Sequence, residues 1–201
     1  MADDASFQLA PALAPPVTAT GRRRLTREDL FAMMRAGVIE EGERTELIDG
    51  ELFPMASEGF DHDDGATDLL DALRAALGGR FLIDSRGPLN ILDATQVAPD
   101  LSVWPLGVRG RDKFANNVLL VVEISNTTSR KDLGRKALLY AAAGVPEYWV
   151  FDVAERRMWV HRGPEPDGWR ERFLLTTPRI APLCAPEAAV DVTELTTPAR
   201  S

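Results

Sequence analysis

The sequence predicts a mixed α/β fold, in which helices flank a central mixed β-sheet and an N-terminal helix and a β-hairpin precede it. Short apolar segments bounded by Pro, Gly, Asn or Asp are typical of strands, and they alternate with longer segments of helical periodicity. With 201 residues, 45% of them hydrophobic, the chain is long enough to form a substantial core. The single cysteine, Cys184, excludes an internal disulfide framework and a cysteine-based zinc cluster.

The N-terminal part of the chain predicts a short helix followed by a hairpin. Thr26 and Asp29 have the spacing of a capping box, and Gly37 is a suitable stop for the helix. In TELIDGELFPM, two apolar segments surround Asp-Gly, the strongest short-range signal for a hairpin. This turn places Glu46 and Glu51 on paired strands.

A second helix is expected from about residue 61 to 77, because its leucines recur at the spacing of one helical face before Gly78. A third is expected from the capping box of Ser129 and Asp132 to about Ala143, with Gly144 as its stop. The remaining periodic segments are interpreted as strands: 81–85, 89–93, 98–104, 117–125, 147–153, 156–162 and 169–177.

Both chain ends are interpreted as loose, which gives a disordered tail over residues 1–24, one domain over residues 25–194 and a C-terminal tail over residues 195–201. Asp3 and Asp4 stand where a signal peptide would carry basic residues, and prolines interrupt the apolar stretch that follows. No run approaches the roughly 18 apolar residues of a membrane helix. We therefore expect a soluble, cytoplasmic protein without a membrane partner.

The net charge of -8 and the pI of about 4.9 argue against a broad, nonspecific electrostatic grip on nucleic acid. Two small basic clusters interrupt the acidic chain, one at residues 22–24 and one formed by Arg109, Arg111 and Lys113. Each cluster by itself is interpreted as solvated loop or tail charge.

Glu123 stands near the end of a run that is apolar enough to be a buried strand. Alternation places Val121, Glu123 and Ser125 on one face of this strand. An ionised glutamate is almost never fully buried without a partner. Glu123 therefore either pairs with a nearby Arg or Lys, or faces a cleft and holds a cation.

Asp100 directly follows Pro99 at the entrance of another apolar strand, so its carboxylate and that of Glu123 are candidates to converge. Two carboxylates with open water positions describe a magnesium site, since a cation would relieve their repulsion. Lys136 lies at i+4 from Asp132 on the following helix. An acidic pair, a metal and a lysine suit phosphodiester hydrolysis. The alternative is an ordinary ion pair of Lys136 with Asp132 or Glu123.

These residues resemble a known group of proteins. Pro99-Asp100 followed by VVEIS is similar to the PD-(D/E)XK nuclease superfamily, whose shared core is a mixed sheet flanked by helices. From about Leu25 to about Val160 the chain resembles, more specifically, the Uma-type family of putative restriction endonucleases. The segments that carry this resemblance are TELIDGELFPM, His62, APDLSVW and LLVVEISNTTSRKDLGRKALLYAAAGVPEYWVFD.

The resemblance implies a restriction-endonuclease-like core, with a divalent metal held by Asp100, Glu123 and the carbonyl of Ile124. The superfamily pattern would place its lysine at Ser125, whereas in the Uma-type family the lysine has moved to the next helix, where Lys136 matches it. Lys131, in the first turn of that helix, is the less favoured substitute. The family's hairpin glutamate and its histidine match two further residues that would border the cleft, Glu46 and His62.

The implied function is a metal-dependent endonuclease that hydrolyses DNA phosphodiester bonds with Mg²⁺, for which Mn²⁺ would substitute. A nuclease of this size commonly needs two copies to cut both strands, so a homodimer fits this interpretation. The alternative is a noncatalytic module that kept the fold to bind DNA or a protein, which the acidic composition favours. Cleavage of RNA or of a branched structure is a third interpretation. Whether Asp100 and Glu123 share a cation separates the first two.

Overall fold

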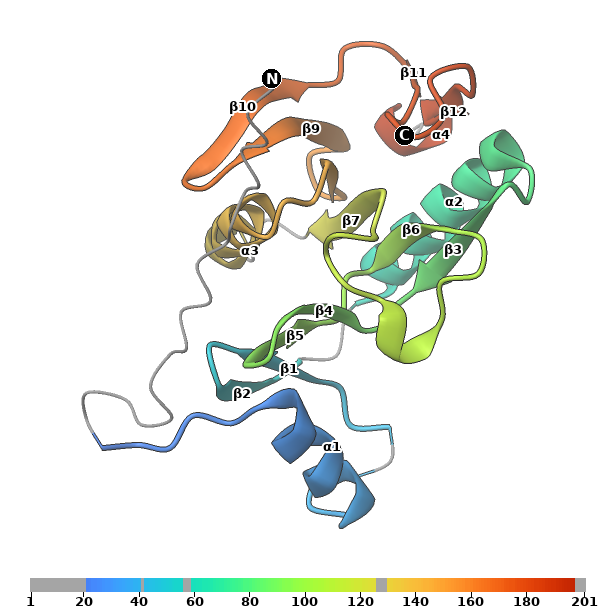
Figure 1. Ribbon diagram of the computed structural model, residues 1–201. Helices are drawn as coiled ribbons and strands as arrows, with labels where there is room; N and C mark the ends of the chain where they lie inside the picture. The colour runs from blue at the N-terminus through green and yellow to red at the C-terminus, as the bar shows by residue number, and fades with distance from the viewer. Residues whose placement is uncertain (1–20, 41, 56–58, 126–129, 198–201) are drawn as a thin grey trace, which may run out of the picture. The chain divides into compact units, whose positions relative to one another are not determined.

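The structure of the chain is a computed structural model, shown in Figure 1. It describes residues 21–40, 42–55, 59–125 and 130–197, without the side chains of residues 130–133. The chain forms two compact units, one of Met1–Met55 with Leu92–Gln96 and one of Ala56–Ile91 with Val97–Ser201. Most of the tail predicted over residues 1–24 lies outside the described residues, and the single domain over residues 25–194 stays a prediction.

The first unit contains helix α1 (Arg27–Arg35) and the hairpin of β1 (Thr45–Ile48) and β2 (Glu51–Pro54). The predicted capping box of Thr26 and Asp29 is present. The predicted turn is confirmed as well, because Asp49 and Gly50 have φ values of 52° and 79°, the left-handed conformations of a type I′ turn. Glu46 pairs with Phe53 across the hairpin.

A four-stranded sheet with the order β2-β1-β5-β4 contains this hairpin. The chain enters this unit in β4 (Leu89–Leu92) and leaves it in β5 (Thr95–Val97). Leu30, Ile39 and Leu47 form its apolar cluster. The predictions of the helix, the hairpin and β4 are therefore confirmed, whereas β5 was not predicted.

A six-stranded mixed sheet with the order β10-β9-β8-β7-β6-β3 forms the centre of the second unit. Only β7 and β8 pair in parallel among the described strand pairs of this sheet, because helix α3 (Arg130–Ala142) connects them as a crossover. The strands are β3 (Phe81–Ser85), β6 (Leu101–Pro105), β7 (Leu120–Ser125), β8 (Glu147–Asp152), β9 (Arg157–Glu165) and β10 (Gly168–Leu174).

Helices α2 (Phe60–Leu77) and α3 cover opposite faces of this sheet. Leu69, Leu73 and Leu77 of α2 are fully buried in one cluster with Val122 and Ile124 of β7, and Figure 1 shows α2 running along β3 and β6. Glu123, between these two residues, points to the other face, where α3 lies. The predicted alternation along β7 is thus confirmed. The capping box predicted for α3 lies outside the described residues.

The C-terminal segment packs against α2 on the face opposite α3. It contains β11 (Arg179–Ile180), β12 (Val190–Asp191) and α4 (Thr193–Thr196), none of which was predicted. Its apolar side chains, including the buried Leu195, join the cluster of α2. The C-terminal tail predicted from residue 195 therefore begins inside α4. A short 3₁₀ helix (Gly110–Asp112) was also not predicted.

A buried ion pair ties this C-terminal segment to the sheet. Glu147 of β8 is fully buried and accepts hydrogen bonds from Arg162 Nε at 2.8 Å and from the N–H of Leu183 at 2.7 Å. Arg162 also donates to the carbonyl of Ala181 at 2.8 Å. A buried carboxylate is tolerated because charged and backbone donors surround it. None of the helices in the described part of the chain is long and apolar enough to cross a bilayer.

Removal of the Glu147 carboxylate should strongly destabilise the fold. Glu147→Ala leaves the guanidinium of Arg162 largely buried without its partner, so the free energy of unfolding should fall by about 3–5 kcal/mol in urea titrations. Glu165→Ala is the control, because it breaks an exposed pair with Arg170 and should cost less than about 1 kcal/mol. If the free energy of unfolding fell equally in both variants, burial of the Glu147–Arg162 pair would not be what stabilises the fold.

Candidate functional site

Two predicted carboxylates lie where the start of β6 meets the end of β7. Leu101, the first residue of β6, pairs with Val122, so Asp100 directly precedes β6 beside the position of Glu123 in β7. The charges of both carboxylates act on the hydroxyl of Tyr148, and the charge of Lys136, which contacts Glu123, also acts on Asp100. The two side chains therefore lie in the same neighbourhood, while a shared cation stays a prediction. Both residues are buried, with exposed fractions of 3% and 4%.

Backbone and imidazole groups hold the carboxylate of Asp100. Its Oδ2 accepts a hydrogen bond of 2.7 Å from the N–H of Ile124 and lies 3.3 Å from Nε2 of His62. Burial acts to raise the pKa of Asp100, but the hydrogen bond and charge of His62, the Ile124 N–H and the charge of Lys136 outweigh it. The resulting pKa is below its ordinary value, so Asp100 is ionised at neutral pH.

His62 reaches Asp100 because the first turns of α2 lie close to the sheet. Gly65, one turn after His62, has no side chain, and a Cβ there would lie 3.0 Å from Val153 and 3.2 Å from Phe151. A larger residue would therefore push the start of α2 away from β8. The sequence places His62 on the buried side of the helix, where it is 8% exposed. His62 thus lies beside Asp100, and its predicted place at the border of a cleft stays a prediction, as does its role.

Glu123 receives two donors from one face of α3. Its Oε1 accepts hydrogen bonds from Lys136 Nζ at 3.1 Å and from Tyr140 Oη at 2.7 Å. Lys136 and Tyr140 are four residues apart, so both project from the same side of the helix. Of the two explanations for a buried glutamate, an ion pair with a lysine is therefore present. An ion pair at this place is also compatible with a shared cation, because a carboxylate has about four acceptor sites.

A cluster of aromatic rings extends from Tyr140 along this face of the sheet. Tyr148 lies 5.1 Å from the ring of Tyr140, 5.2 Å from His161 and 6.0 Å from Trp169, measured between ring centroids. Burial, with the nearby charges of Glu123 and Asp100, raises the pKa of Tyr148 well above its usual value. Its hydroxyl is therefore protonated, and it has no hydrogen-bond partner among the described residues.

The structure says less about the predicted roles of the remaining residues. Glu46 lies on β1 of the first unit and is buried, so its role stays a prediction. Ile124 contributes its N–H to Asp100, while metal binding by its carbonyl is untested. The side chains of Lys131 and Asp132 lie outside the described residues.

Sequence reasoning missed Tyr140 and Tyr148 as neighbours of the carboxylates. Tyr140 was not singled out in the sequence, although its spacing of four residues from Lys136 places both side chains on one helical face. Tyr148 is opposite Val121 in the parallel pair, two residues from Glu123. No sequence signal distinguishes Tyr148 from an ordinary strand aromatic. Only the pairing of β8 with β7 places it near Glu123.

The described residues contain no group of three or more His, Cys, Asp and Glu side chains arranged to hold a metal ion. A cation at Asp100 and Glu123 would therefore need further oxygen ligands from the backbone, water or a bound phosphate. This is how Mg²⁺ is commonly held, since it retains several waters and binds through one or two carboxylates.

Comparisons with known proteins identify the family and the fold of the chain. The sequence profile of the Uma2 family, described as "Putative restriction endonuclease", matches residues 27–193. A crystal structure of a putative nuclease belonging to DUF820 from Anabaena variabilis has a TM-score of 0.67 and 16% sequence identity, over 86% of this chain and 97% of that one. No curated protein matches the chain. The predicted family resemblance and the mixed α/β fold are confirmed.

His161 in the aromatic cluster should make stability depend on pH. Burial, opposed by the carbonyl of Tyr148 and assisted by the charge of Arg172, lowers its pKa from 6.5 to about 4. The unfolded chain therefore binds a proton first, and the stabilisation present above pH 6.5 is lost as the pH falls toward 4. Chemical unfolding across this pH window should show that the free energy of unfolding falls less in His161→Gln than in wild type. Parallel curves for the two proteins would contradict a buried, neutral His161.

Proposed function

The chain belongs to the Uma2 family of putative restriction endonucleases, and from this premise we propose that it is a metal-dependent endonuclease that hydrolyses DNA. One observation carries the proposal: Asp100, directly before β6, and Glu123, near the end of β7, both lie close to Lys136, which is 3.1 Å from Glu123. Two carboxylates and an ammonium group are suited to phosphodiester hydrolysis.

Asp100 and Glu123, with the carbonyl of Ile124, are the proposed ligands of Mg²⁺ or Mn²⁺. The chemistry of the site fits a hydrated cation, because both carboxylates are hard oxygen donors close to the hydroxyl of Tyr148 and to Lys136. The buried hydroxyl of Tyr148, near both carboxylates and without a partner among the described residues, fits water in the same space. When bound, the cation would polarise the phosphate and lower the pKa of a coordinated water.

The other side chains of the site position the two carboxylates and compensate their negative charge. His62 holds Oδ2 of Asp100, which fixes the rotamer of the carboxylate. Tyr140 donates to Oε1 of Glu123 and does the same for that carboxylate. Lys136 places a positive charge next to both, where it would stabilise negative charge that develops on the phosphate. Cutting of both strands would need two copies of the chain, so the proposal includes a homodimer.

A noncatalytic module that binds DNA or a protein is the second candidate. The net charge of -8 favours it, because a protein that holds DNA through long-range attraction is usually basic. In this candidate, Glu123 would need only Lys136 and Tyr140 as partners, and no cation would bind. The two candidates therefore differ in metal binding and in cleavage.

Metal binding should depend on the two carboxylates. Calorimetric titration with Mn²⁺ up to about 1 mM should give saturable binding to wild type, and Asp100→Asn or Glu123→Gln should remove it because each lacks one anionic ligand. Glu187→Gln is the control, since this exposed residue pairs with Arg80 far along the chain from both carboxylates. Equal heats from wild type and Glu123→Gln would favour the noncatalytic module.

Assays of DNA cleavage should distinguish the role of Lys136 from that of the proposed metal ligands. Asp100→Asn and Glu123→Gln should abolish Mg²⁺-dependent cleavage of plasmid DNA, whereas Lys136→Ala should retain Mn²⁺ binding and cut about 100- to 1,000-fold more slowly. Arg135→Ala removes one positive charge from the neighbouring, exposed position of α3 and should cut at the wild-type rate. A Lys136→Ala protein as fast as Arg135→Ala would refute the role of Lys136.

A further inference from the structure

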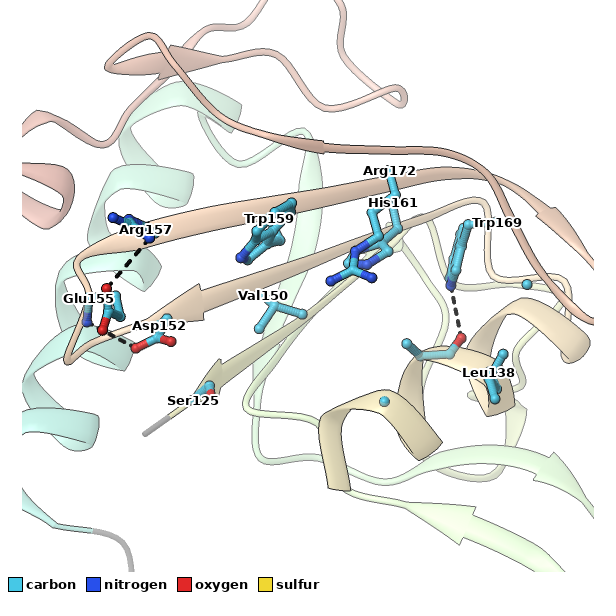
Figure 2. A pocket seen from close by; sticks show the side chains of 13 residues that line it. Ser125, Leu138, Val150, Asp152, Glu155, Arg157, Trp159, His161, Trp169 and Arg172 are labelled. Carbon is cyan, nitrogen blue, oxygen red and sulfur yellow. Dashed lines mark hydrogen bonds and ion pairs between the residues drawn. The ribbon is translucent and has the colours of Figure 1, made fainter. Parts of the chain in front are cut away.

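A cavity of about 510 Å³ lies beside the candidate site, between α3 and strands β8, β9 and β10. Figure 2 shows Trp159, His161 and Trp169 extending from β9 and β10 into this space, with α3 opposite. Its volume is typical of small-ligand pockets, which are roughly 300–1,000 Å³. Ser125 contributes to its wall and is two residues beyond Glu123 on the same face of β7, so the cavity and the carboxylates adjoin.

The walls of the cavity combine planar rings with the guanidinium groups of two arginines, Arg157 and Arg172. The guanidinium carbon of Arg172 lies 4.9 Å from the ring centroid of Trp159, and both residues line the cavity. Trp169 is held in place, because its Nε1 donates to the carbonyl of Ala137 on α3 at 2.9 Å and its ring stacks on Tyr148. Planar walls of this kind favour a planar ligand, since stacking on indole needs a flat partner.

The charges around the cavity favour a neutral group inside and an anionic group at its mouth. Asp152 is buried in the wall and accepts a hydrogen bond of 3.0 Å from the N–H of Glu155, whose own carboxylate lies 3.5 Å from Arg157. A phosphate placed inside would face the carboxylate of Asp152, whereas the N–H groups of a neutral heterocycle are compatible with it. Arg172 is exposed and adds a positive charge at the rim.

We propose that this cavity receives an unpaired nucleobase of the DNA substrate, which stacks on Trp159 while Arg172 contacts the adjoining phosphate. The proposal rests on the nuclease function proposed above and deepens it, because it names an unpaired nucleotide as the part of the substrate that the protein recognises. Aromatic stacking binds any base with little preference for sequence. Ring contacts connect the cavity to the candidate site, because Trp169 stacks on Tyr148, Tyr148 contacts Tyr140, and Tyr140 donates to Glu123.

Binding is best measured with two DNA duplexes that differ at one position. One carries a single unpaired cytosine, and the other carries an abasic nucleotide at the same place. Fluorescence anisotropy in EDTA reports affinity without metal and without cleavage. Wild type should bind the cytosine probe about 5- to 100-fold more tightly than the abasic probe. The cytosine probe alone should also quench tryptophan emission, because Trp159 and Trp169 line the cavity whereas Trp104 and Trp149 are fully buried.

Variants then test whether the cavity is the source of this preference. Trp159→Leu should bind both probes equally, and Trp159→Phe, which keeps a ring for stacking, should retain most of the preference. Arg172→Ala should weaken binding of the cytosine probe. Arg170→Ala is the matched control, because Arg170 is an exposed arginine two residues away on β10 that does not line the cavity. Far-ultraviolet circular dichroism of each variant establishes that it is folded.

The outcomes distinguish this proposal from the nuclease function. Equal affinity of wild type for both probes, or equal weakening by Arg172→Ala and Arg170→Ala, would overturn the cavity proposal, even if the protein cleaves DNA with Mg²⁺. A cytosine preference that Trp159→Leu removes would support the cavity. If Mg²⁺-dependent cleavage were absent at the same time, the nuclease function alone would fail, and the chain would be a module that binds unpaired nucleotides.

Discussion

The hydrogen bond from the N–H of Ile124 to Oδ2 of Asp100 is the contact on which the candidate site depends. Pro99 precedes Asp100, and β6 begins only at Leu101, so at this point a side chain rather than the backbone ladder joins β6 to β7. The bond fixes one oxygen of Asp100 at the level of Glu123, and it stabilises the charged form of the carboxylate. Two buried carboxylates thereby lie near Lys136 and Tyr148, and the groups packed around them have to compensate their charge.

Strand β7 meets this requirement by dividing its side chains between two environments. Val122 and Ile124 enter the apolar cluster under α2, while Glu123 faces α3, which supplies Lys136 and Tyr140. A buried carboxylate without such donors would cost several kcal/mol. The same arrangement gives a physical reason for a lysine on the helix instead of on the strand. The ammonium group of Lys136 approaches Glu123 from the face of the sheet that α3 covers. A lysine at position 125 of the strand is therefore not needed, and the small side chain of Ser125 occupies that position.

How far the sequence predicted the structure depends on whether a feature is local. The capping box at Thr26 and the Asp49-Gly50 turn were predicted because neighbouring residues determine them. The strands β5, β11 and β12 were not, because two or three residues carry no periodicity and gain their stability from distant partners. The convergence of Asp100 with Glu123 followed from alternation and strand adjacency. The aromatic neighbours of these carboxylates did not, because a buried tyrosine has the same sequence pattern whether its hydroxyl meets a carboxylate or not.

An acidic protein that acts on DNA has to gain affinity from local contacts, because its overall field repels the phosphate backbone. At the candidate site the anionic carboxylates are compensated by Lys136 and His62, so an additional cation would reverse the local sign of the charge and attract a phosphate. Next to it, the proposed stacking of a base on Trp159, which lines the cavity, would give binding free energy that does not depend on net charge. These two local terms together would favour DNA in which a base is already unpaired, because a long duplex offers mainly phosphate contacts, and the acidic surface makes those weak.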